Sequence, residues 1–257
     1  MYQAPVVTKA FRILELVAKR NRLMTISDLS RELGINKSTV HGIARALEEV
    51  GAVVRDKGTK RYALGMTLFE LAKADYARID FTEIAHPIME DLERTTQQSV
   101  FLGVRSGEHV SIIDIAESTQ DLKITSPVGT RVPLLAGAIG RTILASMEEN
   151  QAVSLVRSLG LRRFTEKSIT DLNLYMKKVG EARAAGYGLD DEEYIQGVRA
   201  VAALIHNTGP QISVVWVVGF TPSMSAEKLP VIAMETRRAA DAISNKIRLR
   251  SLSGQGQ

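Results

Sequence analysis

Through the first fifty residues, apolar side chains recur at every third or fourth position, which is the spacing of one face of an α-helix. This pattern predicts a first helix over residues 9–19, capped by Thr8. A second helix is predicted over residues 25–33, with Thr25 as its cap and Asp28 at the capping-box position.

Gly34 is predicted to end the second helix, because glycine adopts the left-handed conformation found at many helix C-termini. Ile35 is expected to be buried, and a third helix then runs from Asn36 or Ser38 to Val50. Two helices joined by a turn of about three or four residues containing glycine are typical of a helix-turn-helix.

The third helix has an apolar stripe and, opposite it, a face rich in hydrogen-bond donors. The predicted DNA-contacting residues of this helix are Lys37, Ser38, Thr39, His41 and Arg45. No carboxylate interrupts the face before Glu48, and donors without carboxylates suit a phosphate-lined groove. The alternative is an ordinary solvated face on a three-helix core.

Residues 51–65 predict two strands around a turn at Lys57-Gly58-Thr59. The basic residues of this hairpin are Arg55, Lys57, Lys60 and Arg61. A basic hairpin after a helix-turn-helix is typical of a winged helix, whose wing contacts phosphates or the minor groove. Each phosphate contact releases counterions, so we expect binding to weaken steeply with salt.

The remainder of the chain begins with helical spacing. Residues 66–78 contain no Pro or Gly break and are predicted to form a connecting helix whose exposed apolar residues could serve dimerisation. A helix over residues 82–97, capped by Thr82 and bent at Pro87, follows it.

Beyond residue 99 the spacing alternates between that of strands and that of helices. Strands are predicted over residues 100–104, 110–115, 198–206 and 211–220, and helices over 137–147, 148–159, 172–185 and 226–250. Strands that pair locally, with helices before, between and after them, predict an antiparallel α+β sandwich. Residues 251–257 are predicted to form a polar tail.

Composition narrows the class of protein. The chain has 257 residues, 45% of them apolar, and no cysteine, which excludes disulfides, thiolate–zinc sites and cysteine nucleophiles. No apolar run approaches the roughly 18–20 residues that cross a bilayer, and residues 1–5 lack an export-signal pattern. We therefore expect a cytoplasmic protein with no membrane partner.

The charge is distributed unevenly. Residues 1–65 carry 12 Lys+Arg and 6 Asp+Glu, a net charge of +6, whereas the remaining 192 residues carry 21 and 23, a net charge of −2. A basic first quarter on a nearly neutral body favours contact with a polyanion. Basic residues scattered by chance are the alternative.

No residue pattern of an enzyme or metal site is found. The four histidines lack metal-ligand spacing, and the His-Glu-x-x-His, Gly-x-Ser-x-Gly and Walker patterns are absent. His86 is interpreted as a satisfied helix residue, and the acidic run 190–193 as a solvated loop, with a bound cation as the minor alternative. We expect no catalytic residue, cofactor or metal. An enzyme with an unrecognised site would leave the basic first quarter unexplained.

Three groups of residues carry a family resemblance. They are the run Gly34–His41, the pair Gly129–Leu134 and Gly140–Ala145, and the late segments Gly186–Glu193 and Gly197–Ala203. In these motifs and in the order of its elements, the chain resembles the IclR family of bacterial transcriptional regulators along nearly its whole length.

This resemblance implies an α+β fold in several parts. They are a winged helix-turn-helix over residues 1–65, a linker helix over 66–81, a GAF-like effector-binding domain over 82–250 and a disordered tail over 251–257. It also implies a homodimer, often paired into a dimer of dimers, that binds palindromic promoter DNA. Family effectors are small organic acids, often catabolic or aromatic.

By position in the family, the effector pocket lies between residues 129–143 and the late strands. The residues that the resemblance assigns to its lining are Leu135, Ala138, Ile139, Asp190, Ala200, Trp216 and Val218. The chain departs from the family pattern here, because relatives often carry polar residues where Leu135, Ala200, Trp216 and Val218 stand.

A small hydrophilic acid would lack hydrogen-bond partners in such a pocket, and an unpaired buried carboxylate is very costly. We therefore expect a larger, flatter acid that stacks on Trp216. Its polar end would be held by Asp190, Arg199, Arg131 or backbone amides. The alternative is that Trp216 fills the cavity and no small molecule binds.

Overall fold

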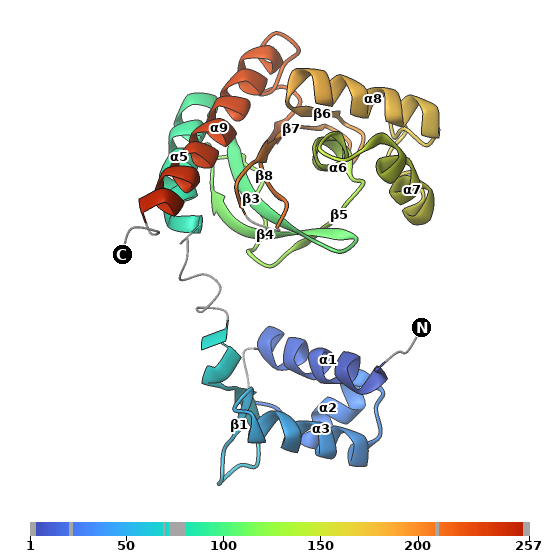
Figure 1. Cartoon of the computed structure of the whole chain (residues 1–257), viewed down its shortest axis with the longest axis vertical. Helices are drawn as coiled ribbons and strands as arrows, with labels where there is room; N and C mark the ends of the chain where they lie inside the picture. The colour runs from blue at the N-terminus through green and yellow to red at the C-terminus, as the bar shows by residue number, and fades with distance from the viewer. Residues whose placement is uncertain (1–3, 21–22, 69, 72–80, 209–210, 254–257) are drawn as a thin grey trace. The chain divides into compact units, whose positions relative to one another are not determined.

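The structure, a computed structural model, describes residues 4–20, 23–68, 70–71, 81–208 and 211–253. The chain divides into two compact units, Met1–Arg78 and Ile79–Gln257, each with its own hydrophobic core (Figure 1).

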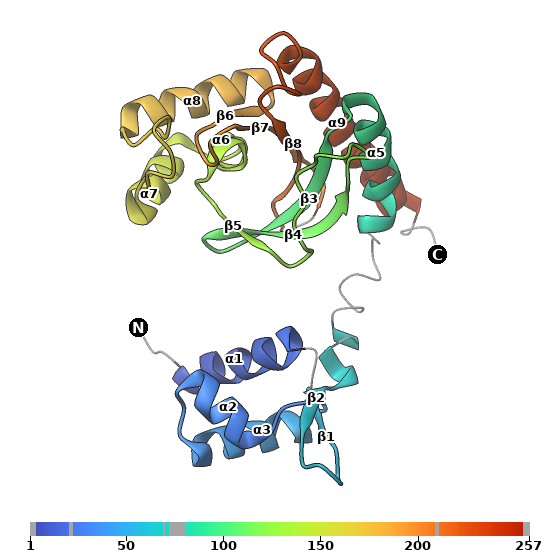
Figure 2. The ribbon, with the colours of Figure 1, turned by 180° about the vertical axis from the view of Figure 1, so that it is seen from behind.

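The described part of the first unit consists of helices followed by a two-stranded antiparallel hairpin, whose strands lie side by side in Figure 2. Its elements are α1 (Pro5–Lys19), α2 (Ile26–Leu33), α3 (Lys37–Glu49), β1 (Val53–Arg55) and β2 (Tyr62–Leu64). This order confirms the predicted helix-turn-helix with its wing.

Helix α1 starts earlier than its apolar stripe predicts, at Pro5. Ala4 is the N-cap and no side chain caps the helix, so the predicted cap at Thr8 is wrong and Thr8 lies within the helix. Proline has no N–H to leave unpaired, and its fixed φ suits the first helical position. The helix therefore starts without a hydroxyl cap.

Helix α2 has the predicted capping box. The Thr25 N–H donates to Asp28 Oδ2 at 3.0 Å, and the Asp28 N–H donates to Thr25 Oγ1 at 3.2 Å. Gly34 ends the helix in the left-handed conformation, with φ of 65°, and Ile35 is buried directly after it. These contacts fix the turn that leads into α3.

Buried apolar residues of the three helices form the core of the first unit, among them Ile13, Leu29 and Val40. Backbone hydrogen bonds between Met24 and Tyr62, at 2.8 and 3.2 Å, join the segment between α1 and α2 to the hairpin. The hairpin is therefore held against the helices at a fixed position beside α3.

The predicted linker helix is described only at its start. Residues 66–68 and 70–71 are helical. Residue 69 and residues 72–80 of this prediction lie outside the described residues.

The second unit is an α+β domain. Its helices are α5 (Phe81–Thr96), α6 (Gly137–Ala145), α7 (Glu149–Leu159), α8 (Leu172–Ala185) and α9 (Leu229–Ser253). Its strands are β3 (Ser99–Ser106), β4 (His109–Ala116), β5 (Arg131–Pro133), β6 (Gly188–Asp191), β7 (Val198–Ile205) and β8 (Ser213–Phe220). Within the described residues these strands form one sheet in the order β5-β4-β3-β8-β7-β6, antiparallel throughout.

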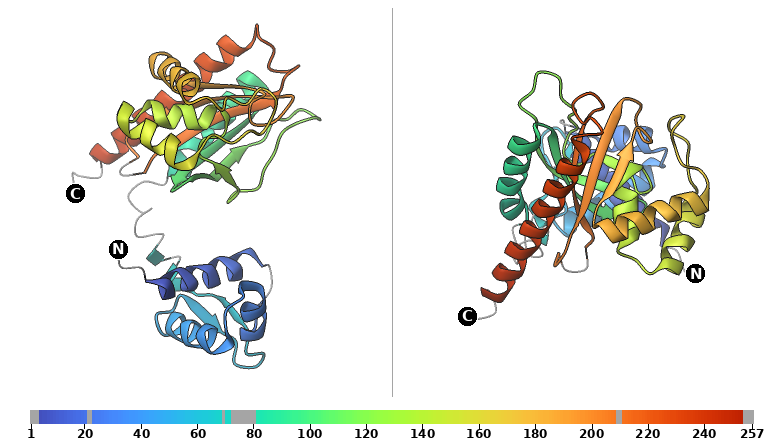
Figure 3. Two further views of the ribbon diagram at one scale, coloured as in Figure 1. Left: turned by 90° about the vertical axis from the view of Figure 1, so that its right-hand side faces the viewer. Right: turned by 90° about the horizontal axis from the view of Figure 1, so that it is seen from above.

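The sheet separates two apolar cores, because side chains alternate between its faces. On one face, residues such as Leu102 and Val217 pack against α5 and α9. On the other face, Phe101, Ala202 and Trp216 pack against α6. The views in Figure 3 show α5 and α9 on one side of the curled sheet and α6 on the other.

Several boundaries differ from the predicted ones. Helix α5 begins at Phe81, so Thr82 lies in its first turn and the predicted cap is wrong. The sequence pattern does not predict β5 or β6, which form the two edges of the sheet and are too short to show an alternating pattern. Helix α9 begins at Leu229 and continues to Ser253, into the segment predicted as a tail.

Candidate functional site

The outward face of α3 presents donors to solvent. Lys37, Ser38, His41 and Arg45 are exposed, and Thr39 is half-buried. The opposite face is buried in the core. The helix is therefore anchored on one side and leaves its predicted DNA-contacting side chains accessible.

The Arg45 side chain has a carboxylate partner on its own helix. Arg45 Nε donates to Glu49 Oε1 at 3.1 Å, with the two side chains 75% and 64% exposed. An exposed pair of this kind contributes little to stability. Its effect is to engage Nε, so that the terminal nitrogens of Arg45 remain for other contacts.

The conformation of the wing tip is stabilised by an exposed acidic residue, Asp56, which accepts hydrogen bonds across the turn. Asp56 Oδ1 accepts hydrogen bonds from the N–H and the hydroxyl of Thr59, both at 2.6 Å. These bonds lower the pKa of Asp56 from its ordinary value. Lys57, Lys60 and Arg61 are exposed around this turn, and Lys60 adopts the left-handed conformation with φ of 59°.

Arg55 lies along the hairpin rather than at its tip. Its guanidinium carbon is 5.7 Å from the centre of the Tyr62 ring on the neighbouring strand, within the range of a cation–π contact. The structure thus gathers three of the four predicted wing residues at the tip and holds the fourth against the hairpin.

In the second unit, a cavity of about 240 Å³ lies between the α6 side of the sheet and the start of α6. The predicted pocket residues that line it are Ala138, Ile139, Asp190, Ala200, Trp216 and Val218. Leu135 is not in the lining of this cavity, although it packs against the same apolar core, and its role in effector binding stays a prediction. In the turn before α6, Ala136 lines the cavity, whereas Leu135 lines a separate cavity and packs towards Tyr175 and its neighbours.

Phe101 and Trp216 form an aromatic wall of this cavity. They face each other on β3 and β8, and their rings stack with centroids 5.4 Å apart and planes 13° apart. Trp216 is only 4% exposed. Since Phe101 already stacks on the indole, a ligand is left with the other face or the edge of Trp216.

Comparison with known families decides the assignment. The model for the IclR helix-turn-helix domain matches residues 6–57, and the model for the bacterial transcriptional regulator IclR C-terminal domain matches residues 74–245. The chain belongs to the IclR family of transcriptional regulators. It is thus a DNA-binding regulator with a C-terminal effector domain, and its relatives are named as regulators rather than enzymes.

Individual IclR-family proteins match nearly the whole chain. The HTH-type transcriptional regulator KipR of Bacillus subtilis is 29% identical over 242 residues, which are 94% of this chain and 96% of KipR. The crystal structure of an IclR regulator from Alicyclobacillus acidocaldarius has a TM-score of 0.76 at 28% identity, covering 96% of this chain and 100% of that one.

An IclR homologue from Microbacterium hydrocarbonoxydans, solved in complex with 4-hydroxybenzoate, shares the fold. Its TM-score is 0.75 at 23% identity, and the match covers 95% of this chain and 99% of that one.

Asp190 is a buried acidic residue in the lining of the cavity beside Trp216. It lies on β6, is 6% exposed, and accepts a hydrogen bond from the Glu193 N–H at 2.7 Å. Burial raises the pKa of Asp190 to about 6, because the charged form loses hydration. A carboxyl in this state is a strong hydrogen-bond acceptor at neutral pH and a donor in mild acid.

Two arginines were candidates for holding the polar end of an effector, and only one is placed to do so. Arg131 lines the cavity. Arg199 lies on the other face of the sheet, where it bonds to the Met224 carbonyl at 2.8 Å and to Asp191 at 2.5 Å. Its predicted role is therefore wrong, because alternation along β7 turns it away from Ala200.

The acidic run is not a solvated loop, so that interpretation is wrong. Asp190 is buried, and the Glu193 side chain is 14% exposed and paired with Arg141. Asp191 and Glu192 both pair with Lys167. The sequence cannot indicate these pairs, since the partners come from segments remote along the chain.

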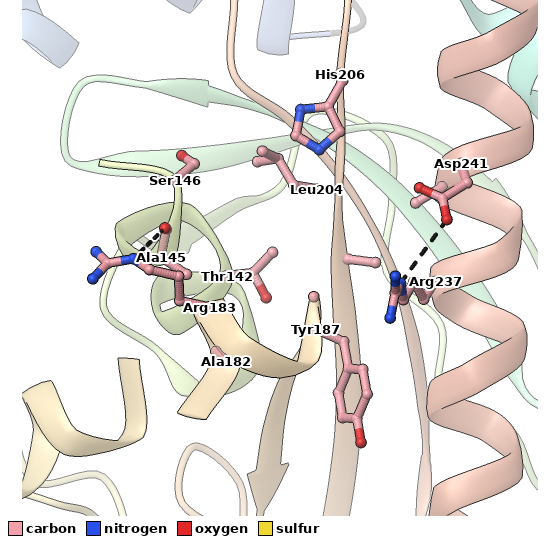
Figure 4. Close-up of a pocket in the computed structure, with 13 residues that line it drawn as sticks. Thr142, Ala145, Ser146, Ala182, Arg183, Tyr187, Leu204, His206, Arg237 and Asp241 are labelled. Carbon is pink, nitrogen blue, oxygen red and sulfur yellow. Dashed lines mark hydrogen bonds and ion pairs between the residues drawn. The ribbon is translucent and has the colours of Figure 1, made fainter. Parts of the chain in front are cut away.

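A second cavity of about 230 Å³ lies beside the C-terminal ends of α6 and α8 (Figure 4). Arg183 donates to the carbonyls of Ala145 and Met147, both at 2.9 Å, and Arg237 donates to the Ala185 carbonyl at 3.2 Å. These bonds satisfy carbonyls that a helix end leaves unpaired. The guanidinium groups of Arg183 and Arg237 are therefore engaged at the helix ends.

Sequence reasoning missed several residues that line the cavity beside Trp216. They are Phe101, Ile112, Ile124, Thr125, Ser126, Thr130, Val132, Ala136, Tyr194, Ile195 and Val198. Strand alternation could have indicated Phe101, which faces Trp216. The loop residues carry no periodic signal that would place them there.

His86 is a satisfied histidine, as predicted. Its Nδ1 lies 2.8 Å from Asp114 Oδ2 and its Nε2 lies 3.6 Å from Glu90 Oε1. Among the residues that the structure describes, no group of three His, Cys, Asp or Glu side chains is placed to hold a metal ion, and no helix is long and apolar enough to span a membrane.

Proposed function

We propose that this regulator binds a compact aromatic acid in the cavity beside Trp216, and that the acid changes its affinity for palindromic promoter DNA upstream of a catabolic operon. The observation that carries the proposal is the cavity itself. With Trp216 stacked on Phe101, about 240 Å³ remains open beside the two rings.

The size and lining of the cavity favour a small, flat ligand. Pockets for drug-sized molecules are roughly 300–1,000 Å³, so a cavity of about 240 Å³ suits a molecule of about one ring. Phe101, Ile112 and Trp216 offer apolar contacts to such a ring. These side chains do not offer the hydrogen bonds that a short hydrophilic acid requires.

The carboxylate of the ligand would lie away from Asp190. Arg131 and the hydroxyls of Thr125 and Thr130 line the cavity. The first turn of α6 does not serve this purpose, because the Asp190 carboxylate lies directly against Gly137 at its start. Arg131 and the two hydroxyls together would offset the charge of the acid.

The DNA-binding half of the proposal rests on α3 and the wing. A homodimer, alone or paired into a dimer of dimers, would place two α3 helices in major grooves about one or more helical turns apart. Lys37, Ser38, Thr39, His41 and Arg45 would contact DNA in the groove, and Arg55, Lys57, Lys60 and Arg61 would contact the backbone beside it. Effector binding would favour one spacing of the two helices.

A thermal-shift panel tests the ligand class. Benzoate and 4-hydroxybenzoate, the acid in the Microbacterium complex, are expected to stabilise the protein more than acetate or pyruvate. Val218→Phe, which narrows the cavity, should abolish the shift, whereas Leu174→Phe on the exposed face of α8 should leave it unchanged. Stabilisation by the short acids alone contradicts the proposal, and no stabilisation by any acid favours Trp216 as a simple core residue.

A gel-shift assay with the DNA upstream of the regulator's own gene tests the proposed DNA binding. We expect a salt-sensitive complex whose affinity changes when a stabilising acid is added. Failure to bind this DNA at low ionic strength, with and without the acids, would overturn the regulatory proposal.

A further inference from the structure

A buried arginine, Arg141, lies next to the proposed effector cavity without lining it. Arg141, on α6, is 3% exposed. One terminal nitrogen donates to the Leu189 carbonyl, the other pairs with the Glu193 carboxylate, and the guanidinium carbon lies 5.6 Å from the centre of the Tyr175 ring. Its Nε is buried with no hydrogen-bond partner in the described part of the chain.

A buried ion pair is weak grounds for stability, because desolvation of both charges offsets their attraction. Two apolar side chains of similar volume would hold α6 against β6 at least as firmly as this ion pair does. The position of Arg141 therefore calls for an explanation other than packing.

Glu193 connects Arg141 to the cavity. Its N–H donates to Asp190 Oδ1 at 2.7 Å, and its carbonyl accepts from Ser168 Oγ at 2.7 Å. The two residues that follow it, Tyr194 and Ile195, line the cavity. The orientation of Glu193 thus fixes both an acceptor and an apolar part of the cavity wall.

We propose that Arg141 is a positioning residue for effector binding: by pairing with Glu193 it holds residues 193–195 in place, and with them the cavity wall formed by Tyr194 and Ile195 and the N–H that bonds to Asp190. Arg141 does not line the cavity, so its influence passes through Glu193 and Asp190. The inference rests on the proposed function, since it names how the same cavity is prepared for its ligand.

The charged groups around Asp190 support this assignment. Glu193, from the loop after β6, opposes ionisation of Asp190, and Arg141, from α6, favours it. Tyr175 from α8 and Tyr194 from the loop lie nearby, and Arg131 on β5 lines the same cavity. Two charges of opposite sign thus act on one buried carboxyl, and they form a pair with each other.

The arrangement makes opposite predictions for the two members of the pair. Arg141→Gln removes the cation and leaves the Glu193 carboxylate, so the titration midpoint of Asp190 should rise, by about one pH unit. Glu193→Gln removes the anion and leaves the cation, so the midpoint should fall. In the double variant the two effects offset, and the midpoint should lie between those of the single variants.

The experiment is a carboxyl ¹³C NMR titration of the full chain labelled at aspartate, in which the Asp190 signal is assigned by its loss in Asp190→Asn. Arg141→Lys is the matched control, because it keeps the charge and loses the planar fork, and its midpoint should stay close to that of the original protein. If Arg141→Gln does not fold, the Arg141→Lys and Glu193→Gln variants still show how the charges of the pair change the titration midpoint of Asp190.

Loss of a neighbouring charge shifts the Asp190 midpoint whatever the role of Arg141, so amide hydrogen exchange of residues 193–195 is measured on the same variants: Arg141→Gln should speed it at least tenfold and Arg141→Lys much less, and unchanged exchange in Arg141→Gln overturns the inference. The titration uses no ligand, so it succeeds or fails independently of the thermal-shift panel. Opposite shifts without binding of any acid would leave the pairing intact and count against the proposed effector.

Discussion

Arg45 differs from the other donors of α3 in having a carboxylate partner, Glu49, one helical turn away. The bond uses Nε and limits the rotamers of a long, flexible side chain. A side chain that is partly ordered before binding loses less entropy on forming a base contact. We therefore propose Arg45 as the residue of α3 that discriminates between base sequences.

We predict that Arg45→Ala weakens binding to a selected operator by about 1–3 kcal/mol and binding to random DNA much less, because base contacts carry the specificity. Fluorescence anisotropy on both DNAs measures the difference, with Arg31→Ala, an exposed arginine on α2 paired with Asp28, as the control. Equal losses on operator and random DNA would remove Arg45 from the recognition role.

Asp190 gives a prediction for stability against pH. Its folded pKa, about 6, lies above its ordinary value of 3.8. The stability linked to this carboxyl is therefore full below pH 3.8 and is lost as the pH rises through about 6. Asparagine cannot ionise and still accepts the Glu193 N–H.

Asp190→Asn should thus gain stability relative to the original protein as the pH rises from 4 to 8, by on the order of 2 kcal/mol. Urea unfolding across this range measures the difference. Asp241→Asn, at an exposed carboxylate on α9, is the control and should show no such trend. A pH-independent difference for Asp190→Asn would mean that the carboxyl is not strained by burial.

At the scale of elements, local signals account well for the first unit. The capping box at Thr25 and Asp28 and the left-handed Gly34 are contacts within a few residues, so the sequence predicts them directly. The wing is also local, since Asp56 and Thr59 close its turn. A predicted helix boundary is wrong where no capping side chain marks the end of the helix. Helix α1, for example, begins at Pro5 without a side-chain cap.

The wing provides a prediction at this scale. Lys57→Ala and Lys60→Ala should weaken operator and random DNA alike and reduce the slope of log affinity against log salt by about 1 each, because each lysine neutralises a phosphate. Titrations at several salt concentrations measure the slope. Lys178→Ala, an exposed lysine on α8, is the control. An unchanged salt slope would place the wing away from the DNA backbone.

At the scale of the molecule, the chain divides into two compact units, and the first carries the predicted DNA-contacting residues. If two α3 helices bind half-sites on one side of the duplex, the spacing of the half-sites must match whole turns of the helix.

Inserting 5 base pairs between the half-sites should therefore lower affinity by about tenfold or more, and inserting 10 base pairs should lower it less, since the half-sites return to the same side. Gel shifts on the three DNAs measure this. Equal affinity for all three would indicate that each copy binds its half-site independently.

The sequence alone determined the helix-turn-helix, the wing and the basic first quarter, and the family resemblance predicted six residues that line one cavity. These follow from spacings of three or four residues, from turn residues and from a resemblance to a family. Such signals are local, so they need no knowledge of the rest of the chain.

Only the tertiary structure decided which side chains share the cavity and in what charge state. It placed Leu135 and Arg199 outside the cavity, buried Asp190, and brought Arg141 to Glu193 across 52 positions of sequence. These outcomes depend on strand pairing and on which face of the sheet each residue occupies. For Asp190 and Arg199, which lie on strands, a change in register of one residue would exchange the faces that they occupy.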